Sequence, residues 1–214
     1  LSKRIEQAAR RSGRSPGDIT FVAVSKGVAP PTLQEAIHAG IKVFGENRVA
    51  EAIHKFSEWR ESISLHLVGS LQTNKVKKAV GFFDLIHSID SIRLAEEVAV
   101  EATRQSIVQP VLVQVNVAQE ATKRGVSLDD APRLVEAVRQ CPSLRLLGLM
   151  TIPPQQPDAE GARPYFIKLR ECGVAMGLFQ FSMGMSDNFD VAIEEGATWV
   201  RIGTALFGER PIVG

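Results

Sequence analysis

Short runs of apolar and β-branched residues recur along this chain, and each is followed by a longer stretch with apolar positions three or four residues apart. The run at 19–24, ITFVAV, follows the turn residues at 15–18 and predicts a short buried strand. The stretch at 92–104 has the spacing of a helix with one apolar face. The pattern predicts strands and helices that alternate along the whole sequence.

Eight strand–helix units follow one leading helix. The leading helix is expected over 2–12, with Ile5, Ala8 and Ala9 on one face and Gly13 after its end. The strands are expected at 19–24, 41–44, 65–68, 84–87, 111–117, 145–149, 178–182 and 198–202. Helices between them are expected at 33–39, 48–59, 92–104, 129–140, 158–172 and 187–195.

Polar residues precede two of these helices. Thr32 is expected to cap the helix after the first strand, and Ser186 or Asp187 the helix before the last strand. Caps of this kind mark helix starts, so they support the alternation of the two element types.

Alternating strands and helices, without a linker or low-complexity tract, predict a parallel sheet with helical crossovers. Eight units in about 200–250 residues point to a single α/β domain over 1–214, a TIM-type (β/α)8 barrel with an extra N-terminal helix. A doubly wound open sheet is the alternative. It is disfavoured because no glycine-rich dinucleotide fingerprint follows the first strand.

Composition narrows the class of protein. A net charge of +1, with Lys75–Lys78 as the densest basic cluster, gives no reason to expect nucleic-acid or anionic-membrane binding. Cys141 and Cys172 have neither the number nor the spacing of a zinc site or a disulfide scaffold, which favours the cytoplasm. No apolar run approaches the ~20 residues of a transmembrane helix. The charged start at Leu1 is unlike a signal peptide, and we expect a few residues to precede it.

In a TIM-type barrel the active site lies in the loops at the carboxyl ends of the strands. Lys26 directly follows the first strand. In a partly dry rim its pKa would fall from about 10.4, and the free amine could form a Schiff base with a carbonyl compound. The alternative is a solvated lysine in a loop.

The loops after the last two strands are the usual phosphate-binding place in such barrels. Gly203 permits close approach of the backbone and Thr204 adds a hydroxyl, while the loop from Ser182 to Ser186 offers similar groups beside them. Together with Lys26, these loops indicate a phosphorylated carbonyl compound held as an imine.

Other polar residues are more ambiguous. Arg201 lies within the last strand, where a buried charge needs either a core carboxylate or a ligand as its partner. His66 and His87 lie on short strands and are expected to be core or rim histidines rather than bases. Tyr165, the one tyrosine of the sequence, is expected at the start of a helix away from the rim.

Several sequence blocks also resemble a known family, the pyridoxal phosphate homeostasis proteins (YggS/PROSC type). More distantly, the chain resembles the barrel domain of alanine racemase and thus the fold-type III pyridoxal phosphate proteins. The blocks are VAVSK at 22–26, FGENRVAE at 44–51, HLVGSLQTNK at 66–75, SID at 88–90, VNVAQEATKRG at 115–125, GLMTIP at 148–153 and SMGMSDNFDVAIEEGATWVRIGTALFG at 182–208.

The resemblance implies pyridoxal 5′-phosphate as cofactor, held by Lys26 as an internal aldimine. It also implies that Ser182, Gly203 and Thr204 bind the phosphate. By the same resemblance, Asn47 lies near the ring and Arg201 faces the pyridine nitrogen. The implied function is cofactor homeostasis or supply, with little or no catalysis. We expect a cytoplasmic monomer whose partners are the cofactor and apo-enzymes that receive it.

Two enzymatic alternatives stay open. An amino-acid racemase would need an acid/base group on each face of the Cα, and beyond Lys26 the sequence offers no suitably placed tyrosine. A Schiff-base aldolase or phosphosugar isomerase would need a carboxylate base in the rim, for which Glu46 is the candidate.

Overall fold

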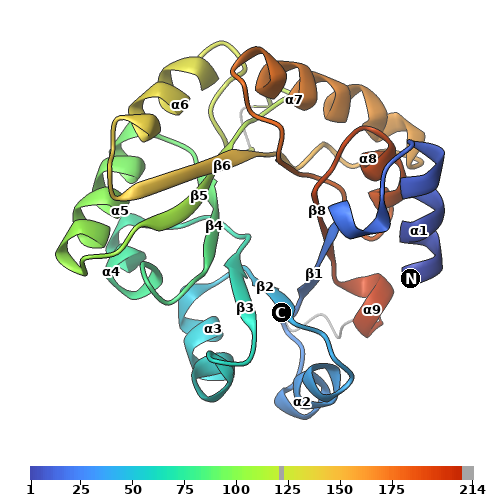
Figure 1. Ribbon diagram of the computed structural model, residues 1–214, viewed down its shortest axis with the longest axis horizontal. Helices are drawn as coiled ribbons and strands as arrows, with labels where there is room; N and C mark the ends of the chain where they lie inside the picture. The colour runs from blue at the N-terminus through green and yellow to red at the C-terminus, as the bar shows by residue number, and fades with distance from the viewer. Residues whose placement is uncertain (121–122, 209–214) are drawn as a thin grey trace.

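The computed structural model of the protein describes residues 1–120 and 123–208. Eight parallel strands close into a barrel in the order β1 to β8, and β8 pairs with β1 (Figure 1). This closure confirms the predicted (β/α)8 barrel and excludes an open sheet. The strands are β1 Thr20–Val24, β2 Val43–Glu46, β3 Ser64–Leu67, β4 Leu85–Ile89, β5 Gln109–Gln114, β6 Leu144–Met150, β7 Phe181–Ser182 and β8 Trp199–Ile202.

The helices lie on the outside of the ring of strands (Figure 1). They are α1 Ser2–Arg11, α2 Pro30–His38, α3 Val49–Phe56, α4 Val76–Ala79, α5 Ile92–Arg104, α6 Ala131–Arg139, α7 Arg163–Ala175, α8 Phe189–Glu194 and α9 Thr204–Phe207. Four 3₁₀ turns accompany them: η1 Pro16–Asp18, η2 Ser57–Trp59, η3 Thr73–Lys75 and η4 Glu160–Ala162. The leading helix α1 packs beside α8, where Arg4 and Arg11 bond to Asp190 and Glu194.

Helix starts differ from the predicted ones. Thr32 lies inside α2, whose N-cap is Ala29, because the prolines that follow Ala29 suit the first helical turn with their fixed φ. Neither Ser186 nor Asp187 caps α8. The N-cap is Asn188, whose Oδ1 accepts a hydrogen bond from the Met185 amide.

The ends of two strands also differ from the predicted ones, because pairing with the neighbouring strand decides where a strand ends. The second strand was expected at 41–44 but extends through Gly45 and Glu46, because these residues pair with His66 and Leu67 of β3. The strand expected at 178–182 is limited to the two residues of β7.

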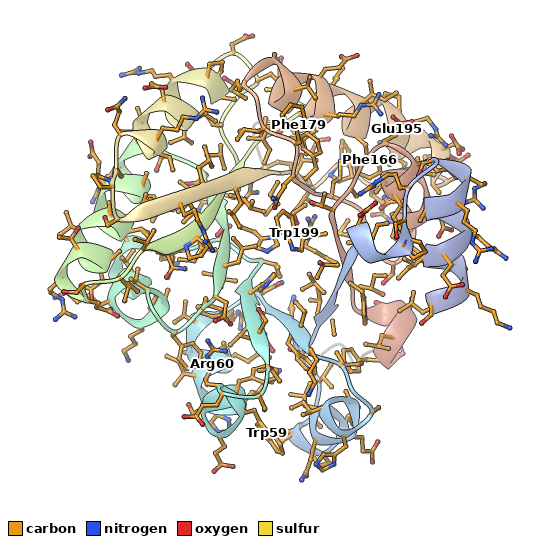
Figure 2. All side chains as sticks on the ribbon, viewed as in Figure 1. Trp59, Arg60, Phe166, Phe179, Glu195 and Trp199 are labelled. Atoms are coloured by element: carbon orange, nitrogen blue, oxygen red, sulfur yellow. The ribbon has the colours of Figure 1, made fainter. Side chains whose placement is uncertain are left out.

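The interior of the barrel is a small apolar core separate from the larger core under the helices. It contains Val22, Val68, Leu85, Leu112, Met150 and Trp199. Trp199 is labelled near the centre of the ring in Figure 2. Side chains two residues apart on a strand point to the same face, so Arg201 follows Trp199 into the interior, and Lys26 follows Val24. Among the helices of the described residues, none has the length and apolar character needed to span a membrane.

Candidate functional site

A cavity of about 950 Å³ opens at the carboxyl ends of the strands. Five of the six predicted site residues line it: Lys26, Asn47, Arg201, Gly203 and Thr204. The sixth, Ser182, is fully buried and does not line it. The prediction that chemistry concentrates at this end of the barrel is therefore consistent with where these side chains meet.

Lys26 is the second residue after β1, and it lines the cavity. It is exposed, and within residues 1–120 and 123–208 nothing bonds to its ammonium group. A ligand in the cavity can reach a lysine nitrogen that has no partner, whereas the nitrogen of a lysine in an ion pair is already occupied by the carboxylate. The geometry leaves Lys26 available as a nucleophile.

Arg201 is a buried cation with only neutral partners. Its side chain, on a residue 4% exposed, donates from Nη1 to Ser182 Oγ at 2.6 Å and from Nη2 to the Thr151 carbonyl at 2.8 Å. The core carboxylate considered as its partner is not there, and burial lowers the pKa of Arg201 to about 10. The guanidinium has five N–H hydrogens, and those not used in these bonds can serve an acceptor in the cavity.

A chain of buried polar groups lies behind Arg201. Ser182 Oγ is 2.8 Å from His87 Nδ1, and His87 Nε2 is 3.0 Å from His66 Nδ1. His66 Nε2 in turn is 3.2 Å from Ser64 Oγ. Because Arg201 donates to Ser182, the arrangement that gives every hydrogen an acceptor runs outward, with each histidine protonated on Nε2. In the reverse arrangement the buried Ser182 hydroxyl hydrogen would have no acceptor.

Both histidines are neutral in this chain, as expected for core residues rather than bases. Burial lowers the pKa of His66 to about 4, with Asp84 opposing the shift. Burial, and then His66 and Arg201, lower the pKa of His87 well below its ordinary value. Trp199 packs edge-on against the His87 ring at 6.0 Å between centroids. Ser182 is thus a link that holds Arg201, and its hydroxyl does not face the cavity.

The predicted phosphate-binding loops do converge, with a different serine in the cavity. Ser186 lines it beside Gly203 and Thr204, and Ser186 Oγ accepts from the Ala205 amide at 3.2 Å. In the described part of the chain the amides of Gly203 and Thr204 donate to no carbonyl. Two free amides and a serine hydroxyl suit an anion. Ser186 is thus a second serine of the segment from Ser182 to Ser186 that faces the predicted phosphate site, and the phosphate contact of Ser182 stays a prediction.

Asn47 enters the cavity at the end of β2, where the chain passes close to the β3 exit. A Cβ at Gly69 would lie 2.3 Å from the Asn47 carbonyl oxygen, so only glycine fits this crossing. The position of Asn47 therefore depends on a close backbone contact that spacing alone could not reveal.

Four further cations line the cavity and were not predicted as site residues: Arg48, Lys75, Lys123 and Arg124. Among the described lining residues, Asp187 is the acidic one. The excess of positive charge favours an anionic ligand and raises its local concentration. The Lys75–Lys78 cluster was the sequence signal for one of these residues.

Two other candidates fall outside the cavity. Glu46, considered as a rim base, is wrong for that role: it points outward from β2, is fully buried, and bonds to Ser25 and Lys55. Tyr165 lies on α7 and does not line the cavity, as predicted. In the residues that the structure describes, no group of His, Cys, Asp and Glu is arranged to hold a metal ion.

Comparisons with known proteins identify the family of the chain. Residues 2–211 match the family described as alanine racemase, N-terminal domain. The chain is 46% identical to a pyridoxal phosphate homeostasis protein of Aquifex aeolicus, over 97% of this chain and 94% of that protein. It is 42% identical to the protein of the same name from Pseudomonas aeruginosa, over 98% and 93%.

Solved structures give the same picture. PipY of Synechococcus elongatus, solved with PLP bound, superposes with a TM-score of 0.83 at 34% identity, covering 96% of this chain and all of that one. An alanine racemase of Clostridium difficile superposes with a TM-score of 0.76 at 13% identity, over 99% of this chain and 56% of that one. The second likeness shows a shared fold alone.

Proposed function

The chain belongs to the family of pyridoxal phosphate homeostasis proteins, and on that premise we propose that it binds pyridoxal 5′-phosphate covalently through Lys26 and serves the homeostasis and supply of that cofactor. The observation that carries the proposal is one cavity that holds a lysine and two backbone amides without partners among the described residues, together with a buried guanidinium that has donors to spare. Each of these groups matches one part of the cofactor.

The fit can be followed part by part. The Lys26 amine matches the aldehyde, because primary amines condense with aldehydes. Gly203 and Thr204 with Ser186 match the phosphate, while Ser182 contributes from behind by holding Arg201. Asn47 would lie near the ring, and Arg201 would face the ring nitrogen. The cofactor would supply a carbonyl carbon that bonds reversibly to amines, that of Lys26 included.

Arg201 also limits the chemistry. A guanidinium donates hydrogen bonds and cannot accept one, so a ring nitrogen opposite it must accept and stays unprotonated. An unprotonated pyridine is a poor electron sink for a carbanion. This arrangement suits stable holding of the cofactor better than broad amino-acid chemistry.

Racemisation is the alternative, and the placement of Tyr165 weighs against it. A racemase needs acid/base groups on both faces of the Cα, and Tyr165 on α7 cannot provide one to the cavity. We expect incubation of the loaded protein with L-alanine to leave its optical rotation unchanged over hours. A steady loss of rotation that depends on Lys26 would favour the racemase.

The finer parts of the proposal concern place and partners. We propose a cytoplasmic monomer that passes its cofactor to apo-enzymes; the free cysteines Cys141 and Cys172 fit a reducing compartment. Light scattering coupled to size exclusion tests the monomer. Loaded protein should reconstitute an apo-acceptor faster than the same concentration of free cofactor, and equal rates would remove the delivery role.

The first experiment is an absorption spectrum of the protein after loading with pyridoxal 5′-phosphate, before and after borohydride reduction, with peptide mapping. We expect a visible absorption band that disappears on reduction, and a reduced label that maps to Lys26. The band should be absent in Lys26→Ala. Lys168→Ala, an exposed lysine of α7, is the matched control and should retain the band. A wild-type protein that takes up no cofactor would overturn the proposal.

A further inference from the structure

A second lysine lies directly behind the Lys26 loop. Lys55 of α3 has a side chain only 8% exposed, and its Nζ donates to the Ser25 carbonyl at 2.7 Å, to Glu46 Oε1 at 3.0 Å and to Glu51 Oε1 at 2.6 Å. An ammonium group has three hydrogens, so all of them are used. Held in this way, Lys55 has no lone pair to offer an aldehyde.

These bonds act on the two residues that flank Lys26. On one side, the Ser25 hydroxyl donates to Glu46 at 2.7 Å, and the Ser25 carbonyl accepts from Lys55. On the other side, the Gly27 amide donates to Glu51 at 2.9 Å. The peptide groups before and after Lys26 are therefore fixed, while its own side chain stays free.

The alternation of side chains along a strand explains why the groups around Lys55 and the cavity lie on opposite sides of the barrel wall. Neighbouring residues of a strand point to opposite faces, so Ser25 and Glu46 point out of the barrel toward α3 while Lys26 points in. Glu46 Oε2 also accepts from the Asn47 amide at 3.3 Å. One cluster outside the barrel wall thus holds the backbone of two residues that line the cavity inside it.

The two carboxyl groups around Lys55 have pKa values that are shifted in opposite directions. Burial raises the pKa of Glu46, and the bonds from Ser25 and Lys55 oppose that rise. Partial burial raises the pKa of Glu51 as well, but the bonds from the Gly27 amide and Lys55 outweigh it and leave that pKa lowered. Within residues 1–120 and 123–208, Lys55 is the one cation that bonds to both carboxylates.

We propose that Lys55, Glu46 and Glu51 form a positioning cluster that presents Lys26 to the aldehyde and keeps Lys55 from competing for it; this inference rests on the proposed function. In the step concerned, the unprotonated Lys26 nitrogen bonds to the aldehyde carbon. Its two hydrogens leave with the aldehyde oxygen as water, and a C=N bond remains. Fixed flanking peptides reduce the freedom that Lys26 must lose before that bond can form.

Glu51 offers the sharpest test because it is partly exposed, whereas removing Lys55 would leave the buried Glu46 unpaired and could unfold the protein. Glu51→Ala removes the acceptor of the Gly27 amide, and Glu51→Gln keeps an acceptor oxygen. Stopped-flow absorbance on mixing with pyridoxal 5′-phosphate gives the rate of linkage. We expect about a tenfold slower rate in Glu51→Ala and recovery of most of it in Glu51→Gln.

A second ligand separates positioning from damage to the site. Pyridoxine 5′-phosphate has an alcohol in place of the aldehyde and cannot bond to Lys26, so its affinity reports the rest of the cavity. We expect the same affinity, within about twofold, in wild type and Glu51→Ala. An unchanged linkage rate in Glu51→Ala, or a parallel loss of rate and analogue affinity that Glu51→Gln does not restore, would overturn the inference.

Peptide mapping distinguishes the two proposals. If wild-type protein takes up neither ligand, the proposed function fails and the positioning cluster fails with it. If wild type is labelled on Lys26 but Lys26→Ala is labelled on Lys55, the function stands while the claim that Lys55 is withheld is wrong. We expect Lys55 to remain unlabelled in both proteins.

Discussion

At the scale of single residues, the site is controlled by hydrogen-bond partners more than by residue type. Lys26 and Lys55 are both lysines near the β1 exit, yet one is free and the other has every donor used. Ser182 ends β7 and Ser186 lies in the loop that follows, yet the first is bonded to Arg201 in the interior and the second lines the cavity. Roles at this scale are therefore testable by substituting one member of each pair.

The two serines give the first prediction. Ser182→Ala would leave a buried Arg201 donor and His87 Nδ1 without partners, and should lower the free energy of unfolding by about 1–3 kcal/mol. Ser186→Ala removes a hydroxyl from the cavity and should change that free energy by less than about 1 kcal/mol while weakening phosphate binding. Urea unfolding and phosphate competition measure the two effects. Unchanged stability together with weaker phosphate binding in Ser182→Ala would instead make Ser182 the direct ligand.

The buried histidines predict an acid-sensitive stability. In the unfolded chain His66 takes up a proton near pH 6.5, but in the folded protein only near pH 4, so the unfolded state binds more protons between these values. Stability present above pH 6.5 is therefore lost as the pH falls toward 4, by about 3 kcal/mol for His66 alone. Urea midpoints between pH 7.5 and 4.5 measure the slope.

Matched variants identify the source of that slope. His66→Gln should flatten the pH dependence, whereas His38→Gln removes an exposed histidine of α2 and should leave the dependence on the buried pair intact. If His66→Gln and wild type lose stability in parallel, groups other than His66 are responsible.

At the scale of elements, the fold follows from periodicity while its details follow from contacts. Eight apolar runs separated by helical stretches were enough to predict the barrel, since parallel strands joined by helices have few other solutions. The end of β2 was missed because pairing of Gly45 and Glu46 with β3 decides it. Glu46 was read as a rim base for the same reason: its outward direction depends on the register of that strand.

The same contrast between what the sequence predicts and what tertiary contacts decide holds for the residues of the site. Lys26 and Asn47 were predicted from the rule that strand ends carry the chemistry, and Arg201 from its place within the last strand together with the family resemblance. The choice between Ser182 and Ser186 turns on Gly184, whose φ of +89° redirects the loop. That turn, and the contact of Lys55 with the Lys26 loop, are set by tertiary packing that a single sequence does not encode in any local pattern.

The crossing between the β2 and β3 exits gives a prediction at this scale. In Gly69→Ala the new Cβ would meet the Asn47 carbonyl oxygen at 2.3 Å and its Cα at 2.6 Å, so the Asn47 backbone must move. We expect cofactor affinity to fall about tenfold and stability by about 1–3 kcal/mol. Gly17→Ala is the control, because its Cβ would meet nothing nearer than Ser15 Oγ at 3.6 Å. Equal affinities in the two variants would show that Asn47 does not contribute to binding.

At the scale of the whole molecule, the shortest strand of the barrel lies where the cavity residues meet. β7 has two residues, and its register with β8 places Ser182 opposite Trp199, whereas β5 and β6 pair along six positions. Backbone bonds from Met183 to Trp199 and from Arg201 to Gly184 continue this contact beyond the end of β7. The cavity groups from the β7 exit, from β8 and from the β1 exit all lie at this junction. A ligand bound there would connect the short β7 and its exit with β8 and β1, which already pair along four positions.

Hydrogen exchange on the loaded and unloaded protein tests this connection. Short labelling times report local opening, so cofactor loading should slow exchange at 182–186, 199–204 and 24–27 while leaving α6, on another side of the barrel, nearly unchanged (Figure 1). Protection that rises equally in α6 would mean that binding acts on global unfolding through mass action. Protection confined to 24–27 would mean that Lys26 holds the cofactor without the phosphate-binding loops, and would contradict the site as proposed.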